Sequence, residues 1–207
     1  MKEFTIVRGL FDTRKRALII DEERIRFENK DLKNDLFTVI DKKDIKGIRY
    51  GIHFINGYHF TIGREYLIFI RLSSGNELRI SFKLFYGRKL KEKHQLYVEI
   101  VDALWDCFFN DILDQYERKL ENSEVLTIAG IEIAEDRIKF NGSEILFKEL
   151  ELKRYYHYFM VFSKKNPHLN KMLYYLKDQD AVILLNILNN IIKNERLRAK
   201  EISDRTV

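Results

Sequence analysis

Short segments of β-branched and aromatic residues follow one another along the first part of the chain, with polar turn signals between them. Val, Ile, Phe and Tyr pack well on a pleated sheet, and short runs of these residues bounded by Gly, Asn and Ser are typical of strands. The pattern predicts strands at 4–10, 17–20, 24–27, 45–55, 58–62, 66–72 and 77–82. Asn56-Gly57 and 73–76 are the expected hairpin turns.

The period of the apolar residues changes at Leu96. From there they recur at spacings of three and four, which places them on one face of a helix that we expect to pack on the sheet. These apolar positions are Tyr97, Ile100, Val101, Leu104, Trp105, Phe108, Ile112, Leu113, Tyr116 and Leu120. The stretch 118–124 then becomes polar, and this predicts a boundary between a domain at 1–121 and a shorter one at 122–207.

The second predicted domain repeats the order of strands followed by one helix. Its strands are expected at 125–133, 137–140, 145–147, 150–162 and 171–177, with Asn141-Gly142 as a hairpin turn. A capping carboxylate, Asp178 or Asp180, marks the start of the closing helix. The helix is expected to bury Val182, Leu184, Leu185, Leu188, Ile191 and Ile192. A polar tail, 194–207, ends the chain.

Two pairs of short segments indicate that the chain contains an internal duplication. Segment 21–27 matches 134–140 at four of seven positions, and 43–50 matches 148–155 at three of eight. The pairs occur in the same order, and the polar loop 29–35 can absorb the difference in spacing between them. The sequence therefore predicts two diverged copies of one module.

Composition and charge restrict the classes of function. Apolar residues make up 45% of the 207 residues, which is enough to fill a packed core. Lys and Arg number 37 against 32 Asp and Glu, and the resulting net charge of +5 is small for a dedicated nucleic-acid binder. No apolar run approaches the roughly 18 residues of a membrane span. Because Met1-Lys2-Glu3-Phe4 also lacks the apolar region of a secretory signal, we expect a cytoplasmic location.

Seven short antiparallel strands closed by one amphipathic helix resemble the pleckstrin-homology-like (PH-like) superfold, with its GRAM and bacterial PH-like relatives. The resemblance lies in the hairpin 17–27, the strand within 43–50 and the helix containing Trp105. It covers 1–121 well and 122–195 less well. It implies a mainly β, α+β fold of two PH-like modules, each a bent antiparallel sheet or partly closed barrel capped by a C-terminal amphipathic helix. It also implies binding of lipids, peptides or proteins, although the superfold alone does not fix a ligand.

One candidate site is the basic cluster Arg14, Lys15 and Arg16 between the first two predicted strands, to which Arg8 could add. The resemblance implies that cations at this place grip phosphate groups. Convergent cations suit a polyanion because each one strengthens the attraction to a phosphate. A solvated loop that keeps an edge strand from aggregating explains the same residues, and three cations alone favour this simpler interpretation.

A second candidate site precedes the first helix, where cations alternate with the aromatic residues Phe85 and Tyr86. The cations are Lys83, Arg88, Lys89, Lys91 and Lys93, followed by His94. Aromatic rings among cations can stack on nucleic-acid bases or lie at a membrane interface. A solvated loop is again the simpler interpretation, but positive charge at a helix N-terminus opposes the helix dipole, and this favours a function for the loop.

The sequence offers little support for catalysis or for a metal or other cofactor. A two-residue turn at Asn56-Gly57 would place His53 and His59 on opposite faces of a hairpin, so that they could not share a metal ion. Cys107 lies within the helical pattern without an activating partner. The aromatic run 155–159 is expected to line a strand.

The sequence therefore predicts a non-enzymatic binding or scaffold protein. Its expected partner is another protein or an anionic surface, either phosphate-bearing or membranous. Nucleic-acid binding through 83–94 is the alternative, and an enzyme ranks third. Exposed strand edges favour a homodimer.

Overall fold

A computed structural model describes residues 1–9, 14–28 and 36–204, with side chains up to residue 201. The predicted indel loop 29–35 and Leu10 of the first predicted strand lie outside the described residues. The chain forms two compact units, Met1–Ile112 (unit 1) and Leu113–Val207 (unit 2), which divide earlier than the predicted boundary after residue 121. The fold is mainly β with helices, as the sequence predicted.

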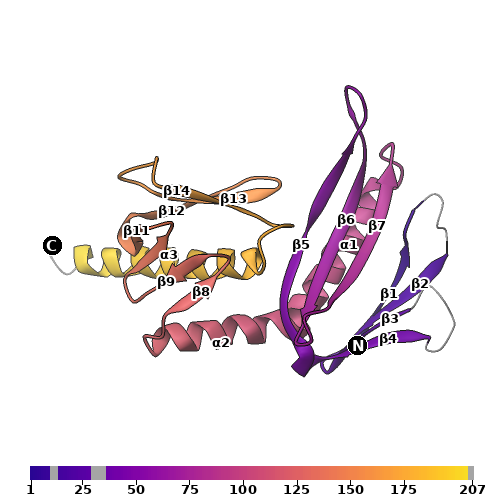
Figure 1. The fold of residues 1–207 in the computed structure, drawn as a ribbon, viewed down its shortest axis with the longest axis horizontal. Coiled ribbons are helices and arrows are strands. Elements are labelled where there is room, and N and C mark those ends of the chain that lie inside the picture. Colours follow the sequence, from indigo (N-terminus) through magenta and orange to yellow (C-terminus); the bar gives the residue numbers. More distant parts are fainter. Residues whose placement is uncertain (10–13, 29–35, 205–207) are drawn as a thin grey trace. The chain divides into compact units, whose positions relative to one another are not determined.

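The described part of unit 1 contains two antiparallel meanders (Figure 1). The first is made of β1 (Lys2–Val7), β2 (Lys15–Ile20), β3 (Arg24–Glu28) and β4 (Phe37–Asp41). A 3-10 turn, η1 (Lys42–Asp44), leads into the second, which is made of β5 (Ile45–Asn56), β6 (Thr61–Leu72) and β7 (Glu77–Phe85). Strand β4 was not predicted, because it directly follows the polar segment that reads as a loop.

A long helical segment follows β7, and it begins before the predicted start at Leu96. It consists of α1 (Leu90–Leu104), the π-helical turn η2 (Trp105–Phe109) and α2 (Asn110–Glu121). The buried face of α1 packs on the second sheet through aromatic side chains. The ring centroid of Tyr97 lies 5.1 Å from that of Tyr66, and the Tyr66 ring stacks on Phe82 with centroids 5.0 Å apart. The apolar period therefore identified the buried face of α1 correctly, whereas the predicted apolar positions on α2 (Ile112, Leu113, Tyr116 and Leu120) are only half-buried.

Unit 2 has the same order of elements as unit 1, with shorter strands (Figure 1). The first meander is made of β8 (Leu126–Ile128), β9 (Ile131–Ile133), β10 (Arg137–Phe140) and β11 (Ser143–Leu146). The turn η3 (Phe147–Glu149) leads into β12 (Leu150–Arg154), β13 (Tyr158–Ser163) and β14 (Asn170–Tyr174). The closing helix α3 (Ala181–Asp204) begins directly after Asp180, within the predicted range.

The two segments that match in sequence hold the same positions in the two units. In each unit one backbone hydrogen bond closes the turn between two strands, which are β2 and β3 in unit 1 and β9 and β10 in unit 2. A second backbone hydrogen bond ties the 3-10 turn to the residue directly before β3 or β10. The bond that closes the turn runs from Asp21 N to Arg24 O (3.1 Å) in unit 1 and from Ala134 N to Arg137 O (2.9 Å) in unit 2. The bond that ties the 3-10 turn runs from Lys42 N to Glu23 O (2.7 Å) in unit 1 and from Phe147 N to Asp136 O (2.9 Å) in unit 2. The predicted duplication requires this correspondence.

Several predicted strand limits were wrong. Only residues 61–62 of the predicted strand 58–62 are in a strand, and they belong with 66–72 to β6, which passes through the buried Gly63. Asn56 pairs with Thr61, so that the hairpin turns through 57–60 rather than through a two-residue loop. In unit 2 the predicted strand 125–133 turns at Ala129-Gly130, where both residues have positive φ. The predicted turn at Asn141-Gly142 is confirmed, because Phe140 pairs with Ser143.

Candidate functional site at one end of unit 1

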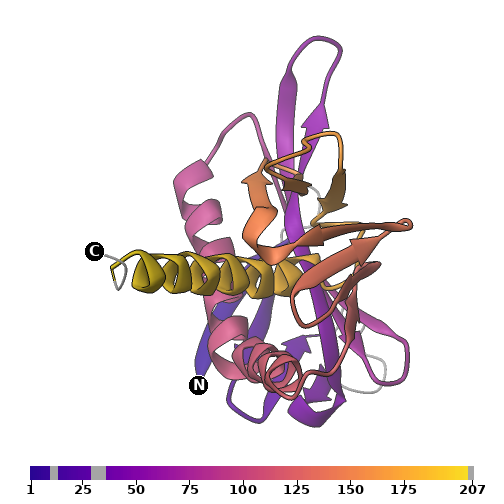
Figure 2. The same cartoon turned by 90° about the vertical axis from the view of Figure 1, so that its left-hand side faces the viewer.

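Three strands of unit 1 bring their ends together at one place, which we call the loop end. The amide of Lys83 on β7 donates a hydrogen bond to the carbonyl oxygen of Arg8 after β1 (2.6 Å). The amide of Tyr86 donates to the carbonyl oxygen of Ile62 on β6 (2.8 Å). The loop end thus comprises the described residues of 8–9, 14–15, 57–64 and 83–91. Figures 1 and 2 show the β5–β6 hairpin rising above the other strands of unit 1 at this end.

The two basic clusters predicted from the sequence therefore meet at the loop end. Val7 pairs with Lys15 across β1 and β2, so the start of β2 lies beside the β1 end that contacts Lys83. No local pattern in the sequence indicated this contact, because it joins the two meanders of the unit. The nine predicted cations nevertheless differ in what they can do.

Lys93 holds the loop end together from within. Its ammonium group donates hydrogen bonds to the carbonyl oxygens of Lys83 (2.6 Å) and Val7 (3.4 Å). Burial, and then the nearby charge of Lys89, lowers the pKa of Lys93 below its ordinary value. Lys93 therefore stabilises the junction between β1 and β7 and does not present its charge to a ligand.

Arg16 is also part of the interior, with 2% of its surface exposed. It lies near Glu28, whose carboxylate accepts hydrogen bonds from the amide of Ala17 (2.9 Å) and from the Arg14 guanidinium (2.8 Å). These two hydrogen bonds, the Ala17 amide first, lower the pKa of Glu28, and the Arg16 charge adds to the effect. Arg14 therefore shares its charge with Glu28 while it stays exposed to solvent.

The remaining predicted cations lie at the surface, except for the half-buried Arg8. Lys83 approaches Glu65 at 3.8 Å, and Lys89 forms an ion pair with Glu92 at 3.3 Å. Within the part of the chain that the structure describes, no ion pair is formed by the exposed side chains of Lys15, Arg88 and Lys91. These three cations are the ones best placed to meet an anionic partner.

Three exposed aromatic side chains accompany these cations. Tyr58 and Phe60, in the turn between β5 and β6, have 99% and 65% of their surface exposed, and Tyr86 after β7 has 73%. The sequence indicated the position of Tyr86 among cations but not that of Tyr58 and Phe60, which were assigned to a strand. Because Tyr58, Phe60 and Ile62 alternate with polar residues, the sequence pattern contained no signal for a longer turn.

The observed register changes the argument about a metal site. His53 pairs with Glu65 rather than with Phe60, and its Nδ1 atom lies 3.9 Å from a carboxylate oxygen of Glu65. His59 lies in the turn. Among the described residues there is no group of three or more His, Cys, Asp and Glu side chains that could hold a metal ion.

Cys107 lies in η2, where it is half-buried. Burial raises the pKa of its thiol, which reduces the fraction of reactive thiolate at neutral pH. This environment is typical of a structural cysteine and gives no support to nucleophilic catalysis.

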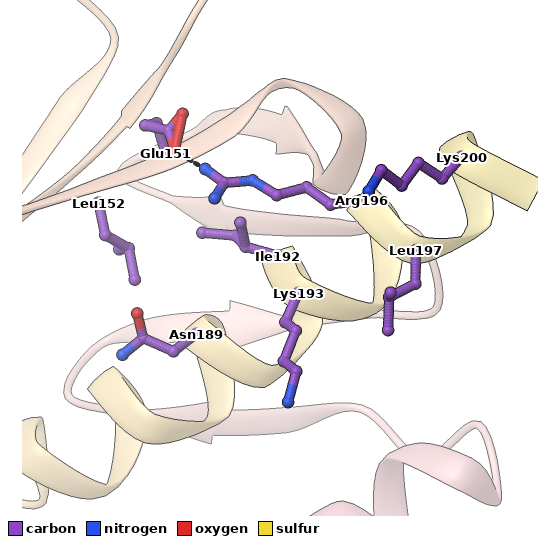
Figure 3. Close-up of a pocket in the computed structure, with 8 residues that line it drawn as sticks. All are labelled: Glu151, Leu152, Asn189, Ile192, Lys193, Arg196, Leu197 and Lys200. Carbon is purple, nitrogen blue, oxygen red and sulfur yellow. Dashed lines mark hydrogen bonds and ion pairs between the residues drawn. The ribbon is translucent and has the colours of Figure 1, made fainter. Parts of the chain in front are cut away.

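Unit 2 contains a half-open groove of about 540 Å³ between β12 and α3 (Figure 3). Leu152 and Ile192 contribute apolar surface, and Lys193 and Lys200 add positive charge. The Arg196 guanidinium reaches across the groove to Glu151 (2.6 Å). The positive charge of Arg196, which is the one best placed to hold a ligand in the groove, is thus already paired with Glu151. The loop end of unit 1 is therefore the stronger candidate site.

Comparisons with known proteins assign no function to this arrangement. No helix in the described ranges is both long enough and apolar enough to cross a membrane. No protein-family model matches the chain, and no curated protein matches it.

Proposed function

We propose that this chain is a non-enzymatic binding protein with two tandem PH-like modules, which attaches to a phosphate-bearing anionic surface through the loop end of unit 1. The hydrogen bond from Lys83 to Arg8 carries this proposal, because it brings two basic segments to one place. The shared order of four strands, a 3-10 turn, three strands and a helix supports the PH-like resemblance of each unit. A cytoplasmic location is part of the proposal.

Electrostatics sets the expected strength of the contact. A Lys or Arg near an anionic membrane contributes about 1 kcal/mol, so Lys15, Arg88 and Lys91 together contribute roughly 3 kcal/mol. Such an attraction acts between exposed charges and is screened within a distance of about 10 Å at moderate salt. The binding should therefore be reversible and sensitive to salt.

The placement of Arg88 and Lys91 is unfavourable for folding, and this also supports a function in binding. Arg88 precedes α1 and Lys91 lies in its first turn. Cations at a helix N-terminus oppose the helix dipole at a cost of a few tenths of a kcal/mol each. Lys93 offsets this cost through its hydrogen bonds, whereas Arg88 and Lys91 form no compensating ion pair among the described residues.

Titration calorimetry of the full chain with inorganic polyphosphate tests the proposal. We expect Arg88→Glu combined with Lys91→Glu to abolish binding. The matched control is Lys43→Glu combined with Lys46→Glu, which makes the same charge change at exposed positions near the other end of β5. Equal loss in both variants would indicate an effect of net charge alone and would overturn the proposed site.

The same measurement separates the nucleic-acid alternative. If a single-stranded RNA binds far more tightly than polyphosphate of similar charge, and Tyr86→Ala removes the difference, the aromatic ring stacks on bases. The loop end would then be a nucleic-acid site. We expect no such preference.

A further inference from the structure

We infer that the β5–β6 hairpin inserts its aromatic tip into the interfacial region of an anionic lipid bilayer. This inference rests on the proposed function, and it specifies that the phosphate-bearing surface is a membrane. The choice of a membrane as the binding partner follows from two features at the same end of unit 1, an apolar tip and a set of cations behind it.

The tip exposes apolar surface that the fold itself does not use. Tyr58 and Phe60 are 99% and 65% exposed, whereas seven other aromatic side chains in the described part of unit 1 are buried in its core. The turn that carries them is closed by a backbone hydrogen bond from Gly57 to Phe60 (2.8 Å). The two rings are therefore held at the end of an ordered hairpin, where a membrane interface can receive them.

Further from the tip, the hairpin carries partly covered apolar side chains and a cation, Arg64. The guanidinium of Arg64 lies 5.1 Å from the ring of Phe54, and Ile55 and Ile62 are half-buried. Tyr86 is fixed beside the hairpin through its hydrogen bond to Ile62. The backbone of this third exposed aromatic residue thus lies beside Ile62, two residues along the chain from Phe60 at the tip.

The cations stand where lipid headgroups would lie if the tip were inserted. Arg88 and Lys91 follow Tyr86 closely in the chain, and Lys83 precedes it on β7. Aromatic side chains at the interface with Lys and Arg at headgroup level form the usual arrangement of a protein that is anchored on an anionic membrane. The order of layers at the loop end, rings at the tip and cations behind, agrees with this arrangement.

The geometry of the rings favours a membrane over single-stranded nucleic acid. Stacking on bases needs rings that present open parallel faces along a groove. At the tip, Tyr58 and His59 meet at an interplanar angle of 64° with centroids 5.9 Å apart, which is an edge contact. These neighbouring rings do not form a continuous stacking surface.

The corresponding hairpin of unit 2 has the same character. Its turn between β12 and β13 is closed by a backbone hydrogen bond from Tyr155 to Tyr158 (2.9 Å). Tyr156 in this turn is 75% exposed, and the exposed Lys153 lies 5.3 Å from the ring of Tyr155. The two copies have diverged in most positions, yet both place exposed aromatic residues beside cations at this turn.

Co-sedimentation of the full chain with phosphatidylcholine vesicles, with and without phosphatidylserine, tests the inference. We expect Tyr58→Ser combined with Phe60→Ser to weaken binding to the anionic vesicles by roughly tenfold or more, while affinity for polyphosphate, which the cations of the loop end hold, falls by much less. Leu36→Ser combined with Val39→Ser is the matched control, since it also replaces two exposed apolar residues of unit 1. This control should bind vesicles as the original chain does.

A direct readout of depth completes the test. With Phe60→Trp, brominated lipids in the anionic vesicles should quench fluorescence more than in the original chain, whose single Trp105 lies in η2. If the Tyr58/Phe60 variant binds vesicles normally and residue 60 is not quenched, insertion is overturned. The proposed function then still stands if Arg88→Glu with Lys91→Glu loses polyphosphate, and it fails if that variant keeps it.

Discussion

The amide of Lys83 donates a 2.6 Å hydrogen bond to the carbonyl oxygen of Arg8, and this contact joins the two meanders of unit 1 at the loop end. The ammonium of Lys93 accompanies the contact by donating to the carbonyl oxygens of Val7 and Lys83. One lysine thus organises the place where the other cations of both predicted clusters gather. The consequences can be tested by substitution.

Lys93→Met should destabilise unit 1 by about 1–3 kcal/mol, because partly buried carbonyl oxygens lose a charged donor. The change retains most of the side-chain volume, so that the effect reports the lost hydrogen bonds. Urea unfolding measures the difference, with Lys91→Met as the control at an exposed neighbouring position. Equal stability of the two variants would contradict the structural role of Lys93.

Arg88→Glu combined with Lys91→Glu should keep or slightly raise the stability of unit 1, by a few tenths of a kcal/mol. Acidic side chains at the start of α1 interact favourably with the helix dipole. Thermal unfolding tests this expectation, and the loss of polyphosphate binding in the same variant then cannot be attributed to unfolding. A clear drop in thermal stability would remove that distinction and count against the dipole argument.

The stability of unit 1 should fall as the pH rises above about 10. Burial, and then the neighbouring Tyr50 and Tyr66, raises the pKa of Tyr97 well above its ordinary value. The unfolded state therefore loses this proton at a lower pH than the folded state does, and stability is lost by up to about 1.4 kcal/mol per pH unit once the unfolded tyrosine ionises.

The alkaline effect can be assigned with Tyr97→Phe, which removes the titrating hydroxyl. Denaturant titrations at several pH values should show a shallower loss of stability in this variant. Burial also raises the pKa of Tyr66, so part of the slope should remain. An unchanged slope would show that Tyr97 does not contribute.

Gly63→Ala should destabilise unit 1 strongly, by about 2 kcal/mol or more. A Cβ atom at this position would lie 2.5 Å from the carbonyl oxygen of Leu84 on the neighbouring strand, so the β6–β7 pairing would have to shift. Gly9→Ala is the control, because there the nearest atom, Cβ of Lys83, lies at an ordinary 3.8 Å. Denaturant midpoints of the two variants measure the contrast, and a tolerated Gly63→Ala would show that this close approach relaxes easily.

The predicted and observed hairpins show which features the sequence could indicate. Asn141-Gly142 turns as predicted because both residues adopt positive φ readily, which is a local property. Asn56-Gly57 carries the same residue types, but β5 and β6 continue to pair up to Asn56 and Thr61, and the turn moves to 57–60. Pairing along a long hairpin outweighed the local preference, and it placed Tyr58 and Phe60 at the tip.

The sequence by itself determined the mainly β class, the helix faces and the duplicated order of elements, because alternation and helical periodicity depend on neighbouring residues. Only the tertiary structure decided which cations face solvent. Arg16 and Lys93 have the same kind of sequence context as Lys15 and Lys91, yet strand pairing and the contact between the meanders buried the first two in part or in full. Pairing of distant strands has no local signature, so the meeting of the two clusters could be found only in the folded chain.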